Sequence, residues 1–192
     1  MAKASVLKPV AKAPLQKLAA KPAPPVARGV PPWIDIARTY LGVHEGDGLH
    51  SNPKVLKFFL EAGHAEVHND HTTPWCAAFV GAVLHEAGLP NTGTLWALDY
   101  AKYGQKIPLD KPAIGAIATK TRHGGGHVFF VVGFDKSRVW GLGGNQNDKV
   151  CVETFPRSVI HSLSWPPGVP LPTPHPASAG VTTGGTGGAR EV

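Results

Sequence analysis

Helical and strand-like hydrophobic patterns occupy different parts of this 192-residue chain. In the first part, apolar positions recur at helical spacing in short segments bounded by proline and glycine, which favours helices. We expect these helices at 33–41, 54–62, 74–89 and 95–103. Further along, short runs rich in β-branched and aromatic residues favour strands. We expect these at 114–119, 127–134, 138–143, 149–155 and 159–164.

Helices followed by a meander of strands predict an α+β domain, in which the N-terminal helices pack on an antiparallel sheet of about five strands. A hydrophobic content of 42% supports one core of ordinary size. Residues 1–30 are rich in Ala, Lys and Pro and contain no acidic residue, and residues 168–192 are rich in Pro, Gly and Thr. We therefore expect a folded domain at 31–167 between a disordered basic arm and a disordered tail.

A cysteine lies at the expected start of the third helix. Thr73 is a suitable N-cap, and Pro74 is preset for the first helical position. The unpaired N–H groups and partial positive charge of a helix N-terminus stabilise a thiolate, lower the thiol pKa and hold an oxyanion. Cys76 is thus a candidate nucleophile; the alternative is a buried structural cysteine.

A predicted hairpin brings a histidine close to an amide side chain. The polar cluster at 135–137 forms the turn between two expected strands. A three-residue loop pairs Phe134 with Arg138, and counting back along both strands places His127 opposite Asn145. Opposed side chains have Cβ atoms about 5 Å apart, within hydrogen-bonding reach for an imidazole and an amide.

This juxtaposition supplies the groups of a thiol hydrolase: Cys76 as nucleophile, His127 as base and Asn145 as the residue that orients the base. A two-residue turn would place Gln146 opposite His127 instead. The simpler alternatives are that the histidine caps a strand and that the asparagine makes a turn.

Three segments resemble the motifs of bacterial and phage cell-wall hydrolases of the NlpC and CHAP type: 74–80, 125–128 and 143–146. The likeness extends over roughly residues 32–167. It implies a papain-like α+β fold in which a cysteine, a histidine and a polar residue cleave peptide or amide bonds of peptidoglycan through a thioester acyl-enzyme, without a cofactor. By motif, Cys76, His127 and Asn145 are the triad. The tripeptide Trp-Cys-Ala at 75–77 departs from the Asp-Cys-Ser of many members and indicates a less characterised branch, so the scissile bond stays open between amidase and endopeptidase cleavage.

Three neighbours of the triad are candidates for substrate binding. Trp75 is expected to line the groove beside the cysteine, with a place in the core as its alternative. Gly126 lies in a glycine run that lets the backbone approach a ligand or simply connects two elements flexibly. Gln146 is the third candidate.

The formal charge of +6 suits an anionic partner. We expect peptidoglycan stem peptides as substrate and anionic wall polymers as partners of the basic arm, whose cations are Lys3, Lys8, Lys12, Lys17, Lys21 and Arg28. No base-reading module is recognisable, so nucleic acid is not expected, and we expect a monomer. No membrane span and no secretory apolar region is recognisable either. These features predict synthesis in the cytoplasm and delivery to the wall by phage-type or specialised release.

Other polar residues support alternatives. His64, His68 and His71, with Asp70 between the last two, have a spacing that zinc ligands can adopt, so a zinc hydrolase is one alternative and a polar loop beside the cleft another. A second polar cluster, at residues 44–47, is open to substrate contact or to solvent exposure alone.

The second cysteine, Cys151, falls in an alternating run and is expected to be a packed thiol without a disulfide to Cys76. A catalytically silent wall-binding module with the same fold is the main rival to an enzyme.

Overall fold

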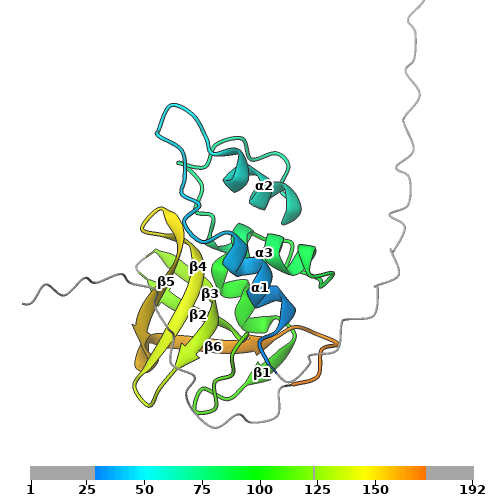
Figure 1. Ribbon diagram of the computed structural model, residues 1–192, viewed down its shortest axis with the longest axis vertical. Helices are drawn as coiled ribbons and strands as arrows, with labels where there is room; N and C mark the ends of the chain where they lie inside the picture. Colours follow the sequence, from blue (N-terminus) through cyan, green and yellow to red (C-terminus); the bar gives the residue numbers. More distant parts are fainter. Residues whose placement is uncertain (1–28, 123, 172–192) are drawn as a thin grey trace, which may run out of the picture.

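The computed structural model describes residues 29–122 and 124–171, and it separates into helices that precede a sheet (Figure 1). The helical segments are α1 (Pro32–Thr39), α2 (Pro53–Glu61), α3 (Cys76–Glu86) and the 3₁₀ segment η1 (Ala97–Lys102). The strands are β1 (Gln105–Ile107), β2 (Ile117–Arg122), β3 (Gly125–Phe134), β4 (Arg138–Gln146), β5 (Lys149–Pro156) and β6 (Ile160–Trp165), with the 3₁₀ turn η2 (Arg157–Val159) before β6.

The strands form one antiparallel sheet in the order β1-β6-β2-β3-β4-β5. Helix α3 packs against β3 and β4, and α1 and α2 pack on α3 (Figure 1). The predicted α+β class is therefore confirmed. The sheet has one strand more than expected because β1 is three residues long with only Ile107 buried, too short to give a pattern in the sequence.

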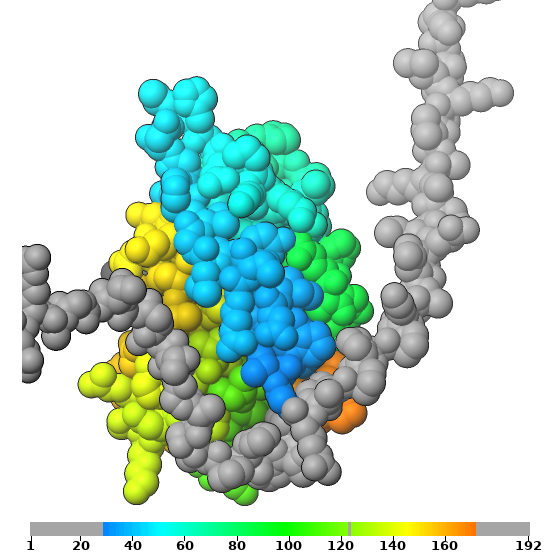
Figure 2. All heavy atoms as spheres, in the orientation of Figure 1, coloured from blue at the N-terminus to red at the C-terminus, as the bar shows by residue number. Residues whose placement is uncertain are grey.

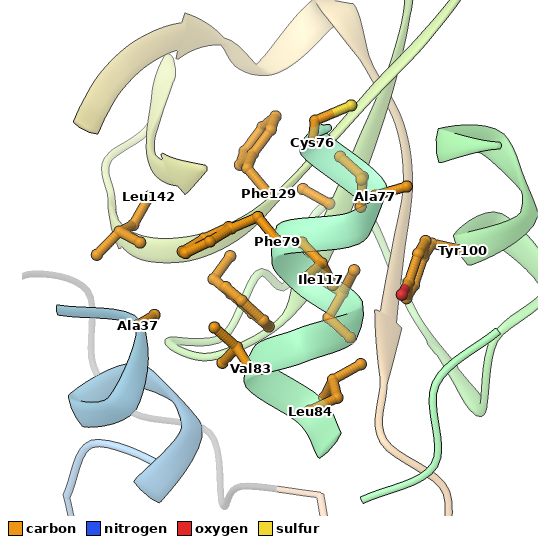
Figure 3. Packing of buried hydrophobic residues seen from close by; sticks show 14 of the residues in the cluster. Ala37, Cys76, Ala77, Phe79, Val83, Leu84, Tyr100, Ile117, Phe129 and Leu142 are labelled. Atoms are coloured by element: carbon orange, nitrogen blue, oxygen red, sulfur yellow. The ribbon is translucent and has the colours of Figure 1, made fainter. Parts of the chain in front are cut away.

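Helix α3 is the centre of the core because it is apolar on every side. Each of its residues from Cys76 to Leu84 is buried. Figure 3 shows its side chains directed toward several elements, with Phe79 and Val83 on one side and Tyr100 of η1 facing another. Phe79 makes edge-to-face contacts with Tyr40, which directly follows α1, and with aromatic rings of α2 and β3. This packing fixes the position of the N-terminal end of α3, where Cys76 lies.

The start of α3 differs from the sequence prediction. Trp75, not Thr73, is the N-cap, and no side chain caps the helix. The first helical hydrogen bond runs from the N–H of Phe79 to the carbonyl of Trp75, at 2.9 Å. The prediction was wrong because the Trp75 side chain is 0% exposed, and its place in the core positions the start of the helix. By contrast, α2 has a side-chain cap, since the Asn52 side chain accepts from Lys54 N.

The register of the β3–β4 hairpin also differs from the prediction. Phe134 pairs with Val139 instead of Arg138, and an irregularity between Val131 and Gly133 shifts the pairing further along the ladder. Pairing of the two strands ends at Phe130 and Leu142. The ladder therefore does not reach His127, and counting residues along it does not identify the side chain that faces the histidine.

Packing continues to the last described residues. Val169 is 1% exposed, and the indole N–H of Trp165 donates to the carbonyl of Pro170 at 3.1 Å. The packed domain thus extends past the expected end at 167. The expected arm and tail fall almost entirely outside the described residues. Within residues 29–122 and 124–171, no helix is long and apolar enough to cross a bilayer.

Candidate active site

Cys76 is the first residue of α3 and lies against strand β3. It is a free thiol and 3% exposed, and Figure 3 shows its sulfur at the N-terminal end of the helix. Backbone N–H groups of Val128, Ala77 and Cys76 itself act to lower the pKa of this thiol. Since Val128 directly follows His127, the nucleophile candidate lies near the strand that carries the base candidate.

Burial raises the pKa of the Cys76 thiol above its usual value. The Val128 N–H, the Arg122 charge and the N–H groups at the helix start act in the opposite direction, but burial outweighs them. The net shift is therefore opposite to the one expected from the helix N-terminus alone. The resting side chain is therefore a neutral thiol, which becomes a nucleophile only when a base removes its proton.

His127 lies near the start of β3 and is 5% exposed. Its ring packs beside Phe129 and Phe155, with ring centroids 5.6 and 6.1 Å away, and those two phenylalanines stack on each other at 4.6 Å. Burial among these rings lowers the pKa of His127 to about 4, against the opposing effect of a hydrogen bond to Gln146. The imidazole is consequently neutral at physiological pH.

Gln146 fixes the protonation of this imidazole. Its amide Nε2 donates to the carbonyls of Gly141 at 3.2 Å and of Cys151 at 2.7 Å, so its Oε1 is the atom turned toward the histidine. The distance from Oε1 to His127 Nε2 is 2.9 Å. Because Oε1 can only accept, Nε2 of the imidazole carries the proton. The other nitrogen, Nδ1, keeps a lone pair and can accept a proton.

The hydrogen bond expected for Asn145 is made by its neighbour. A second irregularity interrupts β4 between Gly143 and Gln146, and Asn145 within it has a left-handed φ of 54°. This local turn brings the Gln146 side chain to His127. Gln146 was also a candidate for substrate binding, but it is 3% exposed and its amide is held by protein groups.

The glycines before Gln146 leave room for this arrangement. A Cβ on Gly143 would lie 2.6 Å from Gln146 Oε1, and one on Gly144 would lie 2.6 Å from the Cβ of Phe79 and 2.7 Å from the Trp75 ring. Such distances are far inside van der Waals contact. The segment 143–146, noted in the sequence as a motif, thus combines close packing on α3 with the presentation of an amide.

The two other predicted substrate contacts have different surroundings. Trp75 is fully buried beside Phe58, and its indole N–H donates to Glu45 at 3.2 Å, so the alternative of a core residue describes it. Gly126 is buried, and a Cβ there would lie 2.6 Å from Leu98. Its lack of a side chain admits η1 against β3.

Comparison with known proteins gives little sequence similarity. No family model and no curated protein matches the chain. Among solved structures, the chain is similar to the peptidoglycan hydrolase RipB from Mycobacterium tuberculosis. The two share 19% identity with a TM-score of 0.44, over 69% of this chain and 62% of the RipB chain. The chain thus spans less than two thirds of the structure that it matches.

Two of the three histidines of the zinc alternative have separate partners. His64 interacts with Glu66 at 2.9 Å, whereas His71 lies 3.7 Å from Glu45 and 3.2 Å from Asp70. Within the described residues, no three His, Cys, Asp or Glu side chains converge in a way that could hold a metal ion. The predicted ligand set is therefore not formed.

The polar cluster after α1 instead organises the loop between α1 and α2. This cyan loop projects from the domain (Figure 2). The buried carboxylate of Asp70 accepts hydrogen bonds from the N–H groups of Gly46 at 3.0 Å and of Asn52 at 2.7 Å. Together with the Glu45–Trp75 hydrogen bond, these contacts connect the loop to the residue that precedes Cys76.

Sequence reasoning missed two exposed side chains near the site. Trp96 is 53% exposed and precedes η1, and Arg122 ends β2. Arg122 lies close enough to influence the pKa of both Cys76 and His127. The feature of the sequence that pointed to this region was the glycine run at 124–126, because residues without side chains leave space for neighbouring groups next to His127.

Proposed function

We propose that this protein is a cysteine hydrolase that cleaves peptide or amide bonds of peptidoglycan, with Cys76 as nucleophile, His127 as base and Gln146 as the residue that orients the base. The observation that carries the proposal is the His127–Gln146 hydrogen bond, which leaves Nδ1 as a proton acceptor on strand β3, against which the helix of Cys76 packs. The resemblance of three sequence segments to NlpC and CHAP motifs supports peptidoglycan as the substrate.

In the proposed first step, His127 Nδ1 accepts the thiol proton while the sulfur attacks the carbonyl carbon of the scissile bond. The negative charge that develops on the carbonyl oxygen is stabilised by backbone N–H groups at the start of α3. Collapse of this intermediate breaks the C–N bond. The imidazolium returns its proton to the leaving amine, and the acyl group stays on Cys76 as a thioester.

In the second step, His127 accepts a proton from water, and the hydroxide attacks the thioester carbonyl. The C–S bond breaks, the thiolate regains the proton from the imidazolium, and a carboxylic acid leaves. Gln146 Oε1 accepts the Nε2 hydrogen throughout, which holds the ring in one tautomer and stabilises its cationic form. No cofactor enters these steps.

The raised pKa of Cys76 and the lowered pKa of His127 favour a neutral resting pair. Proton transfer is therefore coupled to attack on the substrate, since a stable thiolate–imidazolium pair does not form beforehand. Stabilisation of the oxyanion has to offset the unfavourable charge separation.

The rival function, a silent wall-binding module, is favoured by one observation, the 3% exposure of Cys76. Purified wall suspensions separate the two functions when turbidity and co-sedimentation are measured on the same samples. We expect the wild type to reduce turbidity, and Cys76→Ala to bind the walls without reducing it. Equal turbidity with both proteins, together with co-sedimentation of both, would establish the binding module.

A further inference from the structure

Two exposed side chains flank the start of β3, and neither has a role in the proposed reaction. Trp96 is the only aromatic residue among the large hydrophobic side chains exposed in the described part of the chain. Its indole N–H has no hydrogen-bond partner within that part, and Arg122 forms no ion pair there. An exposed indole and an unpaired guanidinium are both groups that recognise ligands.

Their positions converge on the residues that precede His127. Arg122 is the cross-strand partner of Gly125, and a Cβ on Gly125 would lie 3.9 Å from Cη2 of the Trp96 ring. Leu98, two residues after the tryptophan, packs against Gly126 and fixes this part of η1 on β3. The indole and the guanidinium thus border the same end of the strand, within two to five residues of the proposed base.

Arg122 and Lys120 are both cations on β2, but their surroundings differ. Lys120 pairs with His127 in the sheet, but its ammonium lies 4.8 Å from the centre of the Phe155 ring and is engaged there. The Arg122 guanidinium is exposed; both cations lower the pKa of His127, but of the two only Arg122 is among the charges that lower the pKa of Cys76. It is therefore the cation available to a ligand bound at the thiol.

We infer that Arg122 and Trp96 form a substrate subsite for a free carboxylate next to the scissile bond, with the guanidinium binding the carboxylate and the indole covering the adjoining chain. The inference rests on the proposed function. Guanidinium groups bind carboxylates through two parallel hydrogen bonds, and an indole packs on the aliphatic part of a peptide. Peptidoglycan stem peptides carry such carboxylates, and a stem in which the carboxylate is a carboxamide lacks the charge. The subsite makes the enzyme selective for the acid form.

The test uses two soluble stem peptides that differ only in carboxylate or carboxamide beside the cleaved bond. We expect the full-length wild type to cleave the acid form with a kcat/KM about 10- to 100-fold higher, since a hydrogen bond to a charged group contributes about 1.5–3 kcal/mol. Arg122→Gln should lose this preference by slowing cleavage of the acid form alone. Lys106→Gln is the matched control, because it removes one exposed positive charge at the β1 edge of the sheet.

The two-substrate comparison separates ligand binding from a general effect on the thiol. If Arg122 acted only through the Cys76 pKa, Arg122→Gln would slow both substrates equally, and that result would overturn the inference. Trp96→Ala should raise KM for both peptides, whereas Trp96→Phe should retain most of the affinity. Unchanged KM in Trp96→Ala would remove the indole from the subsite.

A binding measurement tests the subsite without requiring that the peptide be cleaved. Calorimetry with the full-length Cys76→Ala variant should show tighter binding of the acid peptide than of the amide, by about the same factor. If the wild type cleaved neither peptide while this preference persisted, the proposed function would fail and the subsite would stand. Equal affinities for the two peptides would overturn the subsite, whatever the enzyme cleaves.

Discussion

At the scale of single residues, the burial of His127 has a consequence for catalysis at low pH. The reaction needs the neutral imidazole, and burial lowers the pKa of His127 to about 4. We expect kcat/KM on a soluble muropeptide to fall as the pH drops through about 4, well below the ordinary histidine value near 6.5. A pH–rate profile of the free enzyme checks this, and an acid limb near 6.5 would show that His127 is not buried as described.

The same pKa shift predicts a pH dependence of folding. The unfolded state binds a proton at about 6.5 and the folded state at about 4, so the free energy of unfolding decreases as the pH falls between these values. Over the full interval the loss is about 3 kcal/mol. Denaturant titrations at several pH values should show this slope in the wild type and its absence in His127→Gln. Parallel slopes in the two proteins would contradict the assignment.

Substitutions of single residues also distinguish whether Gln146 or Asn145 orients His127. Gln146→Leu keeps the volume but removes the acceptor for His127 Nε2, so we expect hydrolysis to fall about 10- to 100-fold, the effect of an unsatisfied buried hydrogen bond. Asn145→Ala should change the rate about twofold at most and mainly cost stability, because its left-handed φ is strained for alanine. A larger rate loss in Asn145→Ala than in Gln146→Leu would restore the asparagine to the triad.

At the scale of elements, contact with α3 fixes the position of the C-terminal end of β4. Gly144→Ala places a methyl group 2.6 Å from Phe79 Cβ, so we expect a loss of about 1–3 kcal/mol in the free energy of unfolding. Gly125→Ala is the control: its nearest contact is 3.9 Å, and its φ is not left-handed. Denaturation curves should shift for the first variant alone. Equal stability of both would mean that β4 does not pack on α3 as described.

Sequence patterns predicted most elements because their signals are local. The helical spacing of α2 and the runs of β-branched and aromatic residues in β3 to β6 depend on neighbouring residues, and these elements were placed to within about three residues. Which amide faces His127 was not predictable by counting, because two irregularities interrupt the pairing of β4 with its neighbouring strands. The helix cap at Trp75 and the place of Arg122 likewise depend on contacts distant in sequence.

At the scale of the whole molecule, the residues that follow β6 complete the packing of the domain. Residues 29–171 should fold and retain activity on soluble muropeptides. Shortening the chain to 29–167 removes the buried Val169 and the Pro170 acceptor of Trp165, so we expect it to be less stable by about 2–4 kcal/mol. Thermal unfolding of the two fragments checks this expectation. Identical unfolding transitions of the two fragments would mean that the folded domain ends at residue 167.

The central claim, a thiol-dependent hydrolase, is tested most directly by mass spectrometry of soluble muropeptides incubated with the full-length protein in the presence of EDTA. The account predicts products of one hydrolysed amide bond with the wild type and with Cys151→Ser, and none with Cys76→Ser of equal stability. Cleavage by Cys76→Ser at the wild-type rate would contradict it.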